Sequence, residues 1–158
     1  MRRPAVPAAV LLALAAILLL AGCSSAIAGR AVPAGDGSAD SDRGLVTAYY
    51  AELNASADEG TAEQRDFLRR TQHPDFIDRL CDLSGLTLHV LPAMSTFRAD
   101  PEWVAPEDNQ APRGVVYVVG VSISIRQQGA LLGEQIGSQR VVVLDGRAYG
   151  FSPCPRGA

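Results

Sequence analysis

Residues 115–126 read VVYVVGVSISIR, and this stretch decides the fold class. Large apolar residues recur at every second position, which is the period of a β-strand that buries one face. The apolar face consists of Val115, Tyr117, Val119, Val121, Ile123 and Ile125. The other face is mixed, as is common in antiparallel sheets. The stretch therefore predicts a long antiparallel strand.

Further strands are expected on both sides of this one. Residues 86–90 show the same alternation, and residues 136–144 form another β-prone stretch. Asp145-Gly146 is a strong hairpin signal, because both residue types accept positive φ. Residues 147–152 should therefore return antiparallel to 136–144.

Helical periodicity precedes the strands. Apolar residues at i, i+3, i+4 and i+7 predict an amphipathic helix with Asp42 as N-cap and an end that frays from 54–56. These apolar residues are Val46, Tyr49, Tyr50 and Leu53. A second helix is expected from Thr61, where residues 61–64 read as a capping box (TAEQ).

Pro74 should interrupt the helical region, because proline disfavours helical geometry at the preceding residue. A third short helix is expected after it, ended by Ser84-Gly85. Its apolar stripe is Phe76, Ile77, Leu80 and Cys81. Helices followed by an antiparallel meander predict an α+β fold.

Residues 1–22 predict a lipoprotein signal peptide. Arg2 and Arg3 precede an unbroken apolar run over 8–21, which is too short for a comfortable membrane span. The run leads into Leu20-Ala21-Gly22-Cys23, which resembles the bacterial lipobox. In that motif the cysteine receives a diacylglyceryl group and becomes the new N-terminus. An uncleaved anchor helix with an incidental cysteine is the alternative.

A lipid on Cys23 would hold the mature protein on the outer face of the cell membrane without spanning it. Residues 23–42 are mostly small or polar and predict a flexible tether. Residues 43–158 are then a single domain, which suits their length.

Composition excludes nucleic acid as a partner, because the net charge is −3 and phosphate binding needs a basic excess. Loss of residues 1–22 removes two arginines and no acid, which lowers the net charge to −5. All 14 basic residues are arginine, which points to a high-GC bacterial gene.

Cys81 and Cys154 are the two cysteines that remain once Cys23 is lipidated. In an extracytoplasmic protein such a pair predicts a disulfide. A redox or metal pair is the alternative, but the sequence has no Cys-x-x-Cys and no clustered ligand set. No cofactor or metal is therefore expected.

Two histidines could carry chemistry. His73 lies at a helix start near Asp75 and Asp78, where it is either a general base or a capping residue. His89 lies in a strand, on the side opposite the apolar residues, and could line a cavity. No catalytic motif for a serine hydrolase, a phosphate loop or a zinc protease is present.

Two aromatic residues join His89 as candidate ligand contacts. Tyr117 belongs to the long strand, and Trp103 lies in the proline-rich and acidic segment 100–114, which is expected to be a long loop. A tryptophan on a loop is either a contact residue or a lid, or it folds back over the sheet edge.

The chain resembles the nuclear-transport-factor-2-like (cystatin-like) superfamily, in particular its small secreted and lipoprotein members in high-GC Gram-positive bacteria. The residues that carry the resemblance are 46–55 (VTAYYAELNA), Cys81-Asp82, 141–147 (VVVLDGR) and Cys154. The resemblance implies a curved sheet wrapped around helices as a cone with an apolar cavity. Family members include isomerases, cyclases and dehydratases as well as binding proteins, and no catalytic residue carries over.

Together these features predict a membrane-anchored extracytoplasmic lipoprotein. Its domain is expected to bind an apolar small ligand or an envelope protein without catalysis, as an accessory subunit in the second case. The alternative is a small lyase or isomerase with His89 or Asp75 as base in the cavity.

Overall fold

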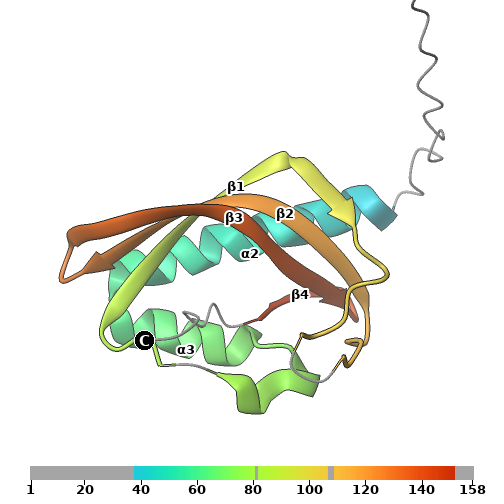
Figure 1. Ribbon diagram of the computed structural model, residues 1–158, viewed down its shortest axis with the longest axis horizontal. Helices are drawn as coiled ribbons and strands as arrows, with labels where there is room; N and C mark the ends of the chain where they lie inside the picture. Colours follow the sequence, from blue (N-terminus) through green and yellow to red (C-terminus); the bar gives the residue numbers. More distant parts are fainter. Residues whose placement is uncertain (1–37, 81, 107–108, 152–158) are drawn as a thin grey trace, which may run out of the picture. The chain divides into compact units, whose positions relative to one another are not determined.

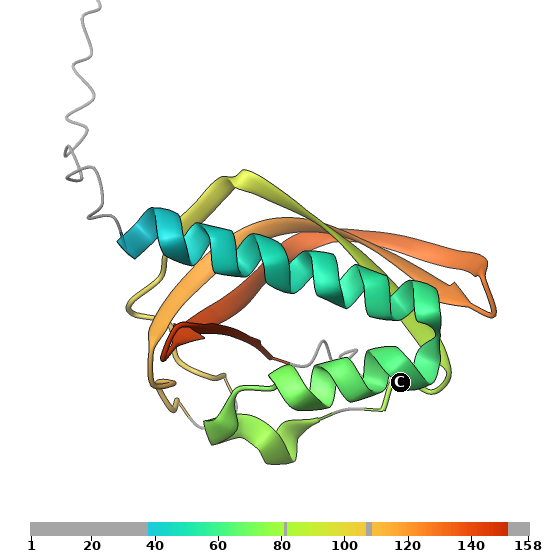
Figure 2. The same cartoon turned by 180° about the vertical axis from the view of Figure 1, so that it is seen from behind.

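The computed structural model describes residues 38–80, 82–106 and 109–151, and the fold is α+β as predicted (Figure 1). The helices of this part are α2 (Ser38–Glu59), α3 (Thr61–Thr71) and the 3₁₀ helix η1 (Pro74–Arg79). The strands are β1 (Leu86–Ala99), β2 (Val115–Gln127), β3 (Ala130–Leu144) and β4 (Arg147–Gly150), antiparallel in the order β1-β2-β3-β4. The sheet curves over α2, which runs along its inner side (Figure 2).

The core forms between the inner face of the sheet and helices α2 and α3. From β2 it receives Tyr117, Val119 and Val121, which confirms the predicted inward face for these residues. Val116 and Val118 on the other face are also buried, at 6% and 3% exposed, so burial does not alternate there. The prediction is wrong at Val115, which is 47% exposed because it is the first residue of the strand and lies outside the core cluster. From the helices the core receives Val46, Tyr49, Tyr50, Leu53, Phe67 and Leu68.

Helix α2 is longer than predicted at both ends. It begins at Ser38, so residues 38–42 belong to a helix and not to the tether. Asp42 is therefore no N-cap: its carboxylate accepts a 2.6 Å hydrogen bond from the Tyr117 hydroxyl. The helix continues past Asn54, whose amide hydrogen-bonds to the backbone of Val90 on β1. Tertiary partners thus stabilise residues whose local propensities favour a helix end.

Helix α3 begins at Thr61 as predicted, but the capping box does not form. The N-cap is Gly60, with φ of 140° and no side-chain capping bond. Gln64 is fully buried instead and hydrogen-bonds to Leu53 and Leu88. Leaving the buried backbone groups of Leu53 and Leu88 without partners would cost more free energy than leaving the N–H groups at the start of α3, because the helix end has access to water.

The predicted third helix is the 3₁₀ helix η1, and its apolar stripe is only partly buried. Phe76 is 1% exposed, whereas the prediction is wrong for Ile77, which is 59% exposed. Consecutive residues cannot share one face of a turn with about three residues per turn. Cys81 lies outside the described residues.

Both hairpins of the meander are tight. Asp145 and Gly146 have φ of 51° and 73°, which fits the predicted two-residue turn. The turn Gln128-Gly129 has φ of 49° and 84° and joins β2 to β3 in the same way. The sequence reasoning missed this turn and therefore began the strand at 136 and not at 130.

Candidate functional site

The three candidate ligand contacts do not form one site. His89 faces the outer side of β1, is 29% exposed and lies 3.6 Å from the carboxylate of Asp58, which is 74% exposed. Tyr117 is buried in the core, with its ring stacked on Phe97 at a centroid distance of 4.4 Å. The ring of Trp103 packs against the ring of Phe151, with centroids 4.7 Å apart. The structure therefore does not bring His89, Tyr117 and Trp103 together, and a ligand contact at any one of them stays a prediction.

Tyr117 is held by its surroundings in the protonated form. Burial and the hydrogen bond that it donates to Asp42 raise the pKa of Tyr117 to about 12. Because the phenol donates its proton to a carboxylate and its ring is covered, it has a structural role at the start of α2.

His73 is fully buried, and both ring nitrogens have partners. Nδ1 accepts a 3.2 Å hydrogen bond from the backbone N–H of Asp75, which makes His73 the N-cap of η1. Nε2 lies 2.9 Å from the carbonyl oxygen of Arg113. A carbonyl can only accept, so the proton of the neutral ring is on Nε2. Neither nitrogen is left to take a proton from a substrate.

Asp75 is paired with Arg113. Its carboxylate receives hydrogen bonds of 2.6 Å and 3.0 Å from the guanidinium group and one of 3.3 Å from the backbone N–H. These bonds hold the pKa of the Asp75 carboxyl below its usual range. Asp75 and His73 together fasten the end of the 100–114 loop to η1.

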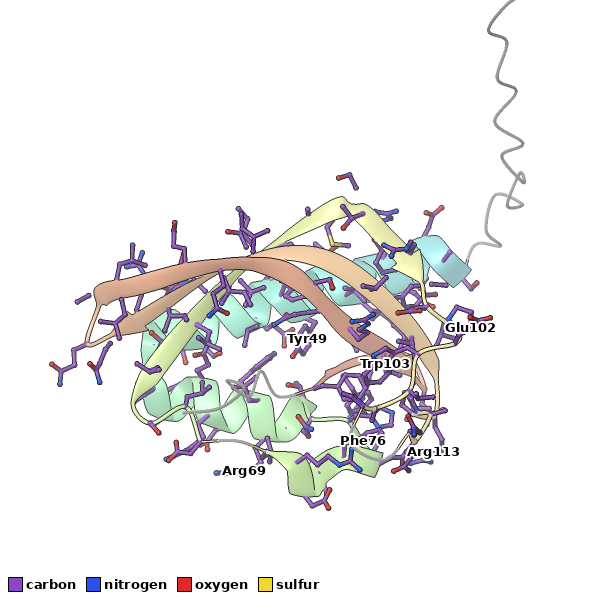
Figure 3. All side chains as sticks on the ribbon, viewed as in Figure 1. Tyr49, Arg69, Phe76, Glu102, Trp103 and Arg113 are labelled. Atoms are coloured by element: carbon purple, nitrogen blue, oxygen red, sulfur yellow. The ribbon has the colours of Figure 1, made fainter. Side chains whose placement is uncertain are left out.

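A second apolar cluster lies beside this contact. The rings of its members have centroids 4.7–6.1 Å apart from neighbour to neighbour, and these members are His73, Phe76, Trp103, Tyr149 and Phe151. Figure 3 shows Phe76, Trp103 and Arg113 together at one end of the sheet. Trp103 therefore takes the role of covering the sheet, and Arg140 lies over its ring at 5.9 Å.

The interior between the sheet and the helices is filled by side chains. Tyr50 and Val119 at its centre are at most 1% exposed, and Tyr49 packs against Phe67 with ring centroids 5.5 Å apart. A surface hollow of about 240 Å³ lies elsewhere, between α3 and the segment after η1. Its lining is Arg65, Leu68, Arg69, Leu80, Asp82 and Leu83.

The hollow combines an apolar floor with charged groups. Leu68 and Leu83 are buried core residues that reach its base. Arg65 and Arg69 come from successive turns of α3, and Arg69 is paired with Asp66 at 3.1 Å. The sequence pattern does not predict this hollow, because the leucines after η1 come close to α3 only through the tertiary fold.

Neither a metal site nor a membrane span is found in residues 38–80, 82–106 and 109–151. No group of three or more His, Cys, Asp or Glu in this part could hold a metal ion. None of its helices is both long and apolar enough to cross a membrane. Cys23, Cys81 and Cys154 lie outside these ranges, as does the signal peptide predicted over 1–22.

No protein-family model, curated protein or solved structure matches the chain.

Proposed function

We propose that the protein is a lipoprotein anchored through Cys23 to the outer face of the cell membrane. The support is the order of charge, apolar run and lipobox in residues 1–23. The described fold begins at Ser38, which leaves 24–37 as a connection between anchor and domain.

The domain, in this proposal, docks a partner protein of the envelope and performs no catalysis. The observation that carries this is the packed interior: Tyr50, Val119 and Val141 of the described core are at most 1% exposed, so no solvent-accessible space adjoins them. A ligand cavity usually has about 300–1,000 Å³. The hollow beside α3 is smaller and carries an apolar floor with arginines, which suits the side chains of a protein surface.

The resemblance to the nuclear-transport-factor-2-like superfamily is part of the proposal. A curved antiparallel sheet that wraps around N-terminal helices supports it (Figure 1). A Cys81–Cys154 disulfide is also proposed, supported by the contact between Phe76 and Phe151 at 5.3 Å, which lie five and three residues from the two cysteines.

The lyase or isomerase alternative gains no support. Its candidate base Asp75 is paired with Arg113, and its other candidate, His89, lies on the outer face of the sheet beside exposed Asp58. A general base has to reach a substrate inside a site that excludes water.

Anchoring is tested by expressing the full chain in a bacterial host that processes lipoproteins. Labelled palmitate should enter the wild type and the matched control Ser24→Ala, and both should fractionate with membranes. Cys23→Ala should lose the label and the membrane association after processing. Membrane-bound, processed Cys23→Ala protein would refute the lipid anchor.

Docking is tested with a photo-crosslinking residue at Arg69 in the hollow and, as control, at Glu52 on the exposed side of α2. A discrete adduct with another envelope protein from Arg69 alone is the expected result. Adducts from neither position, together with extra mass in the native but not the denatured mass spectrum, would replace the partner with a small ligand.

A further inference from the structure

The two long edges of the sheet differ in what covers them. On β1, Asn54 and Gln64 hydrogen-bond to the N–H and C=O groups of Val90 and Leu88 at 2.7–2.9 Å. At the other edge, β4 pairs only with residues 141–144 of β3. Among the described residues, no strand pairs with that side of β3 from 130 to 140.

The register identifies the backbone groups on this open edge. Val90 points its N–H and C=O away from β2, so its partner Ile123 uses its own groups toward β3. Ile123 is opposite Gln135, so Gln135 points toward β2. Since neighbouring residues alternate, the N–H and C=O groups of Glu134, Ile136 and Ser138 point to the open edge.

The side chains on this edge do little to protect it. Ile136 is 90% exposed, and the charged residues from 130 to 140 are Glu134 and Arg140, the latter paired with Asp100. The segment has neither proline nor lysine, the residues that usually block an edge strand. A long exposed edge with an apolar centre is a surface built to add a strand.

We propose that this edge pairs with the same edge of a second copy of the chain, antiparallel, with Ile136 opposite Ile136 of the other copy. This register matches N–H and C=O groups on both strands and places Glu134 opposite Ser138 of the second copy. A register in which one strand slides by four residues would set Glu134 against itself, which like charges disfavour.

The closed β1 edge explains why self-pairing through the β3 edge stops at two copies. If both edges were open, one copy could pair head to tail with the next and form filaments. Because Asn54 and Gln64 occupy the β1 edge, the β3 edge can extend the sheet only through another β3 edge. Such self-pairing is two-fold symmetric and closes at two copies.

The experiment uses the full chain on bacterial membranes, with a photo-crosslinking residue at Ile136 or, as matched control, at Leu91. Leu91 is 72% exposed and lies on the same outer face, two strands away through Ser122. Position 136 should give a product of twice the monomer mass, and position 91 should give none. Products from both positions would mean that copies stack through the sheet face, which would overturn edge pairing.

A second measurement compares Ile136→Lys with Leu91→Lys in cells that carry two differently tagged copies. Like charges facing each other across the edge should lower co-purification about tenfold for Ile136→Lys and leave Leu91→Lys within about twofold of wild type. Both side chains are exposed in the described structure, so neither substitution should unfold the domain. Equal co-purification of the two variants, a cross-link within one chain, or an adduct with another protein would each overturn the second copy as occupant.

This inference does not depend on the lipid anchor or on the hollow. Cys23→Ala should release the protein from membranes and still give the cross-linked dimer from position 136. Failure of anchoring and failure of dimerisation are therefore separate results.

Discussion

The β1 edge and the β3 edge belong to one sheet but differ in whether their backbone N–H and C=O groups have partners among the described residues. At β1, two amide side chains from α2 and α3 take the place of a neighbouring strand. At residues 130–140 of β3, the helices do not reach, and the described residues provide no substitute. The difference shows that an edge can be closed from within by two residues, at the cost of burying their polar groups.

The largest effect is expected for Gln64→Leu. This substitution keeps the volume but removes the hydrogen bonds to Leu53 and to both backbone groups of Leu88, all in a buried place. We expect the free energy of unfolding to fall by about 3 kcal/mol, because buried N–H and C=O groups lose their partners. Urea denaturation of the exported chain measures this.

Glu63→Leu is the matched control, because Glu63 is the exposed neighbour on the same helix. It should change stability by less than about 0.5 kcal/mol. If Gln64→Leu were equally mild, the β1 edge would be satisfied without its amide, and the contrast between the two edges would be lost.

Gly150→Ala should have the next largest effect. A Cβ at this position would overlap the hydroxyl of Tyr49, so β4 would have to move away from α2. A loss of about 2–3 kcal/mol is expected from overpacking, and the open part of β3 should lengthen as β4 withdraws. Thermal unfolding and amide exchange of residues 141–144 report the two effects.

Gly137→Ala on the open part of β3 is the control, because nothing lies within 4 Å of a Cβ there. It should keep or slightly raise the stability. A destabilisation equal to that of Gly150→Ala would indicate that the open edge is covered in the folded monomer.

Asn54→Ala should have a smaller effect than Gln64→Leu, because Asn54 is only partly buried and water can replace its amide. We expect a loss of about 1–2 kcal/mol and faster exchange of the Val90 amide. Glu52→Ala on the exposed side of α2 should leave both unchanged. Unchanged exchange of Val90 in Asn54→Ala would show that the edge is closed by another group.

The sequence predicts the parts of this fold that have a local cause. The inward face of β2 and the turn at Asp145-Gly146 depend on neighbouring residues, and both are confirmed. The ends of α2 depend on distant partners: Asp42 bonds to Tyr117 and Asn54 to Val90. Propensity alone favours ends at these two residues, so the predicted helix is too short.

The candidate site is predicted less well, for the same reason. His89 and Tyr117 lie on strands whose facing direction follows from alternation, but what covers each face does not. The packing of Trp103 could not be predicted from the sequence, because it depends on the tertiary contact between Phe76 of η1 and Phe151. Gln64 carried no signal of a role at a sheet edge, because Leu88 is 24 residues away.

The smallest effect is expected where Asp75 fastens the end of the 100–114 loop to η1, and this effect depends on pH. The Arg113 guanidinium hydrogen-bonded to Asp75 holds the pKa of that carboxyl below its unfolded-state value of about 4. The contribution of the ionised Asp75 to stability is therefore fully present above about pH 5 and is lost as the pH falls through the folded-state pKa.

In Asp75→Asn this contribution is missing at every pH, so between about pH 5 and pH 3 the free energy of unfolding should fall less steeply than in the wild type. Asp78→Asn, at an exposed neighbour on η1, is the matched control. Parallel profiles for Asp75→Asn and the wild type in urea titrations across this range would show that Arg113 does not fasten the loop, and that the aromatic cluster alone closes this end of the sheet.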